Sequence, residues 1–238
     1  MLYDENALQT VREKRLLINH YDDWLFDEFK DFLGQRIIEI GCGLGNQLQH
    51  FTDRELAVGL ETSNESVEYV RNKFANLPNI ETLQLSITNP EVLSLKSRSF
   101  DTAISLNVFE HIQDDLHALR NTYQLLSTNG NFILIVPAHK SLYGTMDSSI
   151  GHYRRYTKNM LRSMMKSIGF RVIKLKYINM LGAIGWGINA RILKKETPPS
   201  DQLKIINSIV PFLHMFESII PAPFGISVLC IGQKIHFG

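Results

Sequence analysis

The residues best suited to chemistry lie in one short stretch, IIEIGCGLGN, at residues 37–46. An apolar run that carries a single carboxylate, Glu39, is followed at once by Gly41, Gly43 and Gly45. Glycine adopts positive φ angles without strain and has no Cβ atom, so a ligand can lie against the main chain and bond to its amide groups. We therefore expect a ligand to approach the backbone closely at this turn.

A second carboxylate, Glu61, lies twenty residues beyond Gly41, at the end of the strand-like sequence LAVGLE. At this distance from a glycine turn, a carboxylate can accept hydrogen bonds from both hydroxyls of a ribose. A dinucleotide-binding turn would follow the pattern G-x-G-x-x-G, but Asn46 stands at its third glycine position and Gly45 comes one residue early. The two features predict a nucleoside ligand and make an NAD-dependent dehydrogenase the weakest interpretation.

Candidate proton acceptors gather in two later segments. LNVFEHI holds Glu110 and His111, and AHKSLYGTMDSSIGHYRRY holds His139 and His152. Histidine suits the task because its unperturbed pKa is close to neutrality. We expect His139 to be the first candidate for a general base and His152 the second, whereas His111 is equally well explained as a structural or cofactor-shell residue.

The second segment also carries candidate substrate contacts, namely Tyr143, Asp147, Arg154 and Arg155. Arginine pairs in a bidentate manner with carboxylate or phosphate, and flanking aromatic rings can stack on a ligand. Arg154 or Arg155 would then hold an anionic group of the substrate. Internal arginine–carboxylate pairs that order the loop are an equal alternative, and the sequence leaves both open.

Strand-like and helix-like patterns alternate along the chain, which predicts an α/β fold with a mostly parallel sheet and helices on both faces. Strands are expected at residues 36–40, 56–61, 80–85, 100–106, 131–136, 171–177 and 226–233. Helices are expected at residues 8–33, 47–52, 63–75, 114–126 and 157–169, with Ser63 or Asn64 and Thr157 as N-caps. The glycine turn then lies beyond the carboxyl end of the first strand, where open α/β sheets bind ligands.

Composition limits the partners. Lys and Arg number 25 against 24 Asp and Glu in 238 residues, and a protein that grips a phosphate backbone normally has a basic surplus, so we expect no nucleic acid. Cys42 and Cys230 are too few for a disulfide framework and lack paired zinc spacing, so we expect a reducing compartment and no metal. The N-terminal sequence has no secretory pattern and no long apolar run exists, which predicts a cytoplasmic protein.

At four places the sequence resembles the S-adenosylmethionine-dependent methyltransferases with a seven-stranded, Rossmann-like fold. IIEIGCGLGN resembles their first motif, GLE their second strand end, and LSIT and LNVFEHI the ends of strands three and four. The resemblance implies a doubly wound, mostly parallel seven-stranded sheet whose last strand is antiparallel. It also implies S-adenosyl-L-methionine as cofactor and S-adenosyl-L-homocysteine as product.

The resemblance further implies a role for each matching residue. Glu39 would lie near the amino group of the cofactor's methionine, and Gly41 and Gly43 beneath its methionine and ribose. Glu61 would hold the ribose hydroxyls. The remaining cofactor-binding positions would be Cys42 and Gly45 in the turn, Thr62, Ser86 and Ile87 around the adenine, and Asn107 and Val108 at the methionine end. Many members of the family have an acidic residue where Ser86 stands, and a hydroxyl accepts the adenine amino group more weakly.

LYGTMDSSIGHYRRYT, LGAIGWGINARIL and PAPFGIS resemble a bacterial methyltransferase subgroup of type 11/12 with a GHYRRY loop. This resemblance implies methyl transfer to an oxygen or nitrogen atom of a small or lipid-linked acceptor. The chain would divide into an N-terminal helical segment that covers the site (1–34), a cofactor-binding core (35–179), an apolar helical insertion between strands six and seven (180–224) and the final strand (225–238).

The insertion and the reaction each leave alternatives. Residues 180–224 are rich in large apolar side chains, including Trp186, Phe212 and Phe216, and would form a cap over the core, a homodimer contact, or a lid or membrane-facing surface for a greasy acceptor. The competing functions are an RNA methyltransferase and a catalytically inactive nucleoside-binding partner subunit. The balanced charge and the absence of an N-P-P-Y-like motif after the fourth strand argue against RNA.

Overall fold

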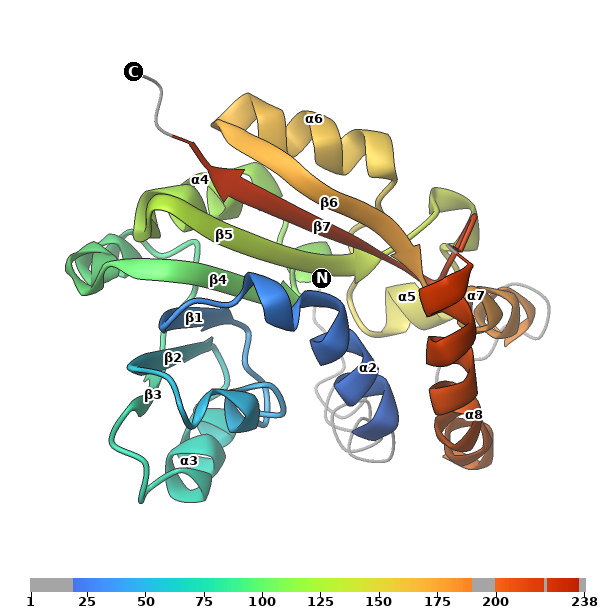
Figure 1. Ribbon diagram of the computed structural model, residues 1–238, viewed down its shortest axis with the longest axis horizontal. Helices are drawn as coiled ribbons and strands as arrows, with labels where there is room; N and C mark the ends of the chain where they lie inside the picture. The colour runs from blue at the N-terminus through green and yellow to red at the C-terminus, as the bar shows by residue number, and fades with distance from the viewer. Residues whose placement is uncertain (1–18, 190–199, 221, 236–238) are drawn as a thin grey trace.

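The computed structural model describes residues 19–189, 200–220 and 222–235, with the side chains of residues 200–206 left aside, and shows a seven-stranded sheet (Figure 1). The strand order is β3-β2-β1-β4-β5-β7-β6, and only β7 runs antiparallel to its neighbours. The strands are β1 (Arg36–Ile40), β2 (Leu56–Glu61), β3 (Ile80–Gln84), β4 (Phe100–Leu106), β5 (Leu126–Pro137), β6 (Phe170–Ile178) and β7 (Ser227–Lys234). The predicted fold class is confirmed.

Helices cover both faces of the sheet (Figure 1). One face packs against α4 (Asp115–Leu125) and α6 (Lys158–Ile168), and the other against α2 (Asn19–Phe29), α3 (Asn64–Lys73) and α8 (Ser200–Ile219). The shorter elements are α5 (Thr145–Ser149), α7 (Met180–Gly187) and the 3-10 helices η1 (Lys30–Phe32), η2 (Leu48–Phe51), η3 (Pro90–Arg98), η4 (Phe109–His111) and η5 (Lys140–Leu142).

The central strands are apolar on both sides because both of their faces are covered. Ile37 and Ile38 are neighbours in β1, and both are fully buried, one in the cluster under α2 and α3 and the other in the cluster under α4 and α6. Successive strand residues point to opposite faces, so a strand that is covered twice has an uninterrupted apolar sequence. This is why the β1 sequence has no alternation of polar and apolar residues.

Most element boundaries agree with the sequence pattern, and two differ. The Ser63 side chain accepts a hydrogen bond from the Ser66 amide, and Thr157 accepts one from the Met160 amide, so both predicted N-caps are present. The segment predicted as a helix near residues 47–52 is the short 3-10 helix η2, and β5 begins at Leu126 rather than at residue 131. Residues 8–18 of the first predicted helix lie outside the described part of the chain.

The insertion joins the sheet through α8. Val210 of α8 is buried against α2, and the His214 ring stacks on Trp24 with ring centroids 5.5 Å apart. Glu217 is also buried, and it accepts hydrogen bonds from the Asn179 and Met180 amides at 2.9 and 2.7 Å. These bonds satisfy backbone N–H groups at the start of α7 that have no partner within the helix. One face of α8 therefore packs onto the core, and the role of the insertion stays a prediction.

The opposite face of α8 is apolar and exposed. Phe212 is 70% exposed, Met215 61% and Ile219 74%. Within the described residues, no helix combines the length and the apolar character that crossing a membrane requires.

Buried Glu28 connects α2 to β6, the edge strand of the sheet, and this contact makes stability depend on pH. Burial alone would raise the pKa of Glu28, but the hydrogen bond from Lys176 and the charges of Lys176 and Lys174 lower this pKa overall. The two lysine Nζ atoms lie 2.8 and 3.3 Å from the carboxylate. Because the pKa is depressed on folding, this stabilisation is present above the ordinary glutamate pKa and is lost as the pH falls through the folded value.

Glu28→Gln should therefore lower the free energy of unfolding at pH 7 by about 1 kcal/mol, since the lysines are partly exposed and the pair is screened. The difference between wild type and variant should shrink below pH of about 4. Urea unfolding at several pH values measures both effects. Glu68→Gln, which removes an exposed pair with Arg71, is the control and should change little. A constant difference down to acid pH would contradict the ionic origin of this contact.

Candidate functional site

The glycine turn after β1 is built around three positive φ angles, 72° at Gly41, 54° at Gly43 and 72° at Gly45. A Cβ atom on Gly41 would lie 2.5 Å from the side chain of Val108, which follows β4. A Cβ atom on Gly43 would meet no atom within 4 Å. The turn therefore packs tightly against the neighbouring strand end at Gly41 and presents bare backbone to open space at Gly43.

Asn46 has a structural role that explains its departure from the dinucleotide pattern. Its side-chain amide donates a hydrogen bond of 2.9 Å to Asp22 in α2, and Asp22 is buried. Lys73, at the end of α3, donates to the carbonyls of Leu44 and Gly45 at 3.3 and 3.4 Å. The turn is thus fixed from two helices, and the sequence pattern by itself pointed to neither contact.

Glu61 connects the end of β2 to the glycine turn. One carboxylate oxygen accepts a hydrogen bond of 3.0 Å from the Gly43 amide, and the other accepts bonds from the amides of Thr62 and Ser63 at 2.7 and 3.0 Å. The Thr62 hydroxyl donates a fourth bond, of 3.3 Å, to the oxygen that accepts the Thr62 and Ser63 amides. The carboxylate that was predicted to hold a ribose is therefore placed at the turn and oriented by the backbone.

The other predicted cofactor residues surround this turn at the carboxyl edge of the sheet. Glu39 is buried in β1, and its negative charge partly offsets the lowering of the Lys73 pKa by burial. Cys42 is buried, and its Sγ atom lies against Gly59 of β2. Asn107 has a φ of 55° and donates its amide to Ile135. These residues occupy the ends of adjacent strands, as the topology requires.

Just after β3, two residues that were predicted to contact adenine form hydrogen bonds within the protein. The Ser86 hydroxyl lies 2.8 Å from the Thr88 hydroxyl and accepts a bond from the Thr88 amide. Ile87 is only 3% exposed and belongs to the core, and its carbonyl accepts a bond from Asn121. Thr62, by contrast, is exposed beside Glu61. The adenine contacts of these residues stay predictions.

Asp147 is the centre of the loop at residues 138–156. Its carboxylate is fully buried and lies 2.8 Å from Arg155 Nε and 2.8 Å from His152 Nδ1. It also accepts bonds from the Gly144 amide at 3.0 Å and from the indole of Trp186 at 3.4 Å. Trp186 was predicted only as part of the apolar insertion, so this contact physically joins the insertion to the loop.

Both arginines of GHYRRY bind acids of their own chain. Arg155 is 1% exposed, donates to the Ala138 carbonyl at 3.1 Å, and lies 4.8 Å from the centre of the Trp186 ring. Arg154 pairs with Asp115 at 2.8 Å and donates to the Gln113 carbonyl. The geometry favours the internal-pair alternative for both residues, and substrate contact by Arg154 or Arg155 stays a prediction. Tyr143 donates its hydroxyl to the His152 carbonyl at 2.8 Å and is partly exposed.

Two of the three candidate bases are brought together, and the third is not. The His111 and His152 rings meet edge to face with centroids 4.6 Å apart, and Glu110 Oε1 lies 3.8 Å from His152 Nε2. His139 instead lies against Tyr177 of β6 with ring centroids 4.6 Å apart. The His139 pKa is lowered by burial and by the charges of Arg155 and Lys158, which favours a neutral ring. A catalytic role for any of the three stays a prediction.

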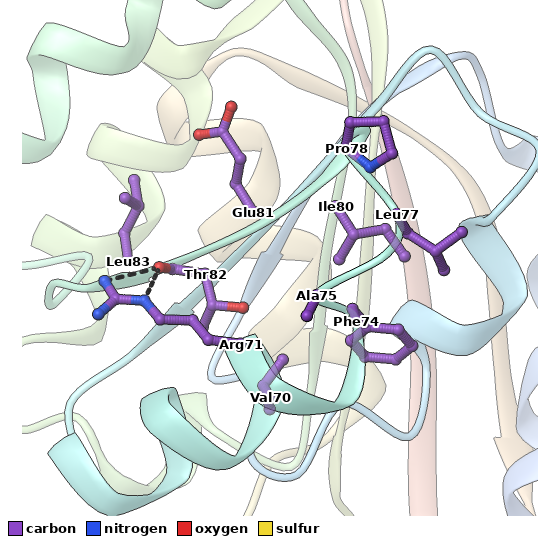
Figure 2. Close-up of a pocket in the computed structure, with 10 residues that line it drawn as sticks. All are labelled: Val70, Arg71, Phe74, Ala75, Leu77, Pro78, Ile80, Glu81, Thr82 and Leu83. Atoms are coloured by element: carbon purple, nitrogen blue, oxygen red, sulfur yellow. Dashed lines mark hydrogen bonds between the residues drawn. The ribbon is translucent and has the colours of Figure 1, made fainter.

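A separate hollow lies between α3 and β3, at the edge of the sheet (Figure 2). Its volume is about 310 Å³, and Arg71 on its wall donates two hydrogen bonds to the Thr82 carbonyl. None of the predicted site residues lines it. This hollow is therefore distinct from the carboxyl edge where the glycine turn and Glu61 lie.

The Asp147 contacts predict a large stability effect. Asp147→Ala leaves the buried Arg155 guanidinium without its carboxylate, and breaking a buried ion pair in this way should lower the free energy of unfolding by about 3–5 kcal/mol. Asp53→Ala removes an exposed pair with Arg54 and should change it by less than about 1 kcal/mol. Denaturant unfolding of both variants measures the contrast. Equal losses would show that the Asp147 network contributes no more than a surface pair.

Comparison with known proteins agrees with the geometry. An uncharacterised 37.1 kDa protein of a Streptomyces fradiae transposon is 25% identical over 150 residues, which cover 60% of this chain and 43% of that protein. A probable S-adenosylmethionine-dependent methyltransferase of Mycolicibacterium smegmatis is 22% identical over 142 residues, 58% of this chain and 53% of that protein. An O-methyltransferase of Pyrenophora dematioidea is 28% identical over 95 residues, 39% of this chain and 36% of that protein. The chain spans about half or less of the length of these curated relatives.

Among solved structures, the YcgJ protein from Bacillus subtilis has a similar fold, with a TM-score of 0.59 at 17% identity over 90% of this chain and 99% of that chain. The family model described as a methyltransferase domain matches residues 13–175, well over half of the chain. Neither comparison tests the finer resemblance of the GHYRRY loop, which stays a prediction. The chain belongs to the methyltransferase domain family, and this membership confirms the predicted enzyme class, its cofactor S-adenosyl-L-methionine and its Rossmann-like fold.

Proposed function

We propose that this protein transfers a methyl group from S-adenosyl-L-methionine to an oxygen or nitrogen atom of a small, amphiphilic acceptor. The observation that carries the proposal is the bond between Glu61 and the Gly43 amide. It places an ionisable carboxylate beside bare backbone at the carboxyl edge of the sheet, where the sugar of a nucleoside can be bound from both sides.

The cofactor would lie along this edge. Its ribose hydroxyls would donate to Glu61, the carboxylate that the Gly43 amide holds at the turn. The open space over Gly43 would accommodate the methionine and ribose, and Glu39 would lie near the methionine amino group. The methyl group would then face the end of β4, where Asn107 and Val108 precede Glu110 and His111.

Methyl transfer from a sulfonium is an in-line displacement with a good leaving group, so the main task of the protein is to position the two reactants. Such positioning can contribute roughly 7–11 kcal/mol to the lowering of the barrier. An acceptor hydroxyl must also lose its proton. His111 and His152 follow the end of β4 and the Asp147 loop, and we assign proton removal to this pair rather than to His139, which lies apart from them.

Three observations support a small, amphiphilic acceptor. One of the similar curated proteins is named an O-methyltransferase. The chain has nearly equal numbers of basic and acidic residues and therefore lacks the basic surplus that RNA binding favours, so the RNA methyltransferase alternative has no specific support. Trp186 of α7 contacts Asp147 and Arg155, so the apolar insertion adjoins the loop that carries His152. Homodimer formation and membrane contact through residues 180–224 stay predictions.

Glu61→Gln tests the cofactor assignment. The amide keeps the shape of the side chain but removes the charge, and hydrogen bonds to charged groups contribute about 1.5–3 kcal/mol, so affinity for S-adenosyl-L-homocysteine should fall about 10–100-fold. Isothermal titration calorimetry measures this affinity. Glu65→Gln, an exposed acid one turn along α3, should bind like wild type. Wild-type affinity in Glu61→Gln, or no binding by the folded wild type, would refute the assignment.

The acceptor class can be tested by release of S-adenosyl-L-homocysteine with four probes: simple phenols, long-chain alcohols, long-chain amines and total RNA. We expect turnover with one of the small-molecule probes and none with RNA, and with that acceptor His152→Ala should lower kcat about 10²–10⁴-fold. Turnover with RNA alone would replace this proposal by the RNA alternative. Cofactor binding without turnover by any probe would favour the inactive partner subunit.

A further inference from the structure

Glu110, His111 and His152 form a compact cluster next to the proposed methyl-transfer site. One ligand-type atom from each residue lies within 4.8 Å of the other two. Glu110 and His111 belong to η4 directly after β4, whereas His152 comes from the loop after α5. We propose that these three side chains bind a divalent metal ion through two imidazole nitrogens and one carboxylate.

The distances fit ligands around an ion better than a direct contact. His152 Nε2 and Glu110 Oε1 are 3.8 Å apart, which is beyond hydrogen-bond range. Metal–nitrogen and metal–oxygen bonds of about 2.0–2.2 Å at tetrahedral angles place two ligand atoms about 3.4 Å apart. The Glu110–His152 separation therefore requires only a small contraction, whereas the cluster as a whole, whose ligand atoms lie within 4.8 Å of one another, requires a larger one through side-chain rotation.

Asp147 gives His152 the support that metal-binding histidines usually have. The carboxylate lies 2.8 Å from His152 Nδ1 and is itself held by Arg155 and by the Gly144 amide. A carboxylate bonded to Arg155 accepts rather than donates, so Nδ1 carries a proton and Nε2 is the ring nitrogen that would coordinate the metal. Nε2 is the atom that faces Glu110. A carboxylate behind a histidine in this arrangement orients the ring toward a metal and increases its basicity.

The charge balance of the cluster also favours a cation. Glu110 is fully buried, and the His152 and His111 rings lie beside it. A buried carboxylate is stable only when positive charge is near it. Arg155 interacts with Glu110 electrostatically, but its Nε is bonded to Asp147. A divalent ion would supply the additional positive charge directly between Glu110 and the rings.

The ligand set indicates which metals would bind. Imidazole nitrogens suit Zn²⁺, Co²⁺ and Fe²⁺, whereas Mg²⁺ and Ca²⁺ prefer oxygen ligands alone. Three protein ligands leave at least one coordination position open, which is the arrangement of catalytic rather than structural zinc sites. Sequence spacing could not reveal this set, because His152 is separated from the other two residues by an entire strand and loop.

The role of the metal, unlike its binding, rests on the proposed function. With the metal bound, His111 and His152 would act as ligands instead of as the base. An acceptor hydroxyl at the open position would release its proton to water more readily, because a bound cation lowers the pKa of a coordinated hydroxyl. The resulting oxyanion would form a bond to the methyl carbon. The carbon–sulfur bond would break with its electron pair passing to sulfur, which gives the methyl ether and neutral S-adenosyl-L-homocysteine.

Metal titration of the full chain tests the site without cofactor or acceptor. After treatment with EDTA and dialysis, the protein should bind one equivalent of Zn²⁺ in competition with a chromophoric chelator, and Co²⁺ should give visible absorption bands of a nitrogen- and oxygen-liganded ion. His111→Ala should weaken Zn²⁺ binding at least 10-fold and abolish the Co²⁺ bands. Asp147→Asn should weaken binding about 10–100-fold. His117→Ala, which changes a histidine of α4 bonded to Asn121, is the matched control and should bind like wild type.

His111 is only partly buried, so His111→Ala should fold, and its thermal unfolding provides the check. No stoichiometric Zn²⁺ binding by folded wild type, or equal binding by His111→Ala, would overturn the metal site and leave His152 as an unassisted base. Glu61→Gln should retain Zn²⁺ binding. Metal binding without S-adenosyl-L-homocysteine binding by wild type would refute the proposed function and leave the metal site intact.

Discussion

The carboxylate of Glu61 is the interaction on which the cofactor edge depends. A turn that contains three glycines at positive φ has few side chains of its own to hold it in place. Its backbone N–H groups also need hydrogen-bond acceptors. Glu61 accepts the Gly43 amide while it also accepts the two amides that start the chain toward α3. One ionised side chain therefore fixes the end of β2 and the turn after β1 in a single geometry, and does so before any ligand arrives.

A second carboxylate, that of Asp147, organises the loop at residues 138–156. Asp147 is buried among Arg155, His152 and the Gly144 amide, which belong to its own loop, and Trp186 of α7. A buried acid is tolerated only because so many donors converge on it. The consequence is a loop that is held in one conformation, with the His152 ring turned toward His111 and Glu110 rather than toward solvent.

The apolar insertion connects the core near α2 to the Asp147 loop and also has an exposed apolar face. α8 closes the core over α2 through Val210 and supports the start of α7 through Glu217, and α7 in turn reaches Asp147 through Trp186. Only one face of α8 is used for packing, and Phe212, Met215 and Ile219 are exposed on its other side. Isolated apolar side chains are common on protein surfaces, but several on one helix form a patch of the kind that contacts other molecules.

The sequence by itself determined the sheet and the cofactor edge, because both are encoded locally. The apolar run of β1 around Glu39, the glycines that follow it and the acid that ends β2 are close in sequence, so their spacing predicted that they would lie at one edge of the sheet. The caps at Ser63 and Thr157 were likewise predictable from residue type. The short 3-10 form of η2 was not, because the apolar pattern does not distinguish it from an α-helix.

Only the tertiary structure decided which partners the candidate histidines and arginines have. The sequence put His139 first among the candidate bases and His152 second, but packing places His139 against Tyr177 and joins His152 and His111 with Glu110. The same holds for Arg154 and Arg155, whose partners Asp115 and Asp147 became known only from the folded chain. The physical reason is that long-range burial selects which charges are paired, and pairing across distant segments leaves no periodic signal in the sequence.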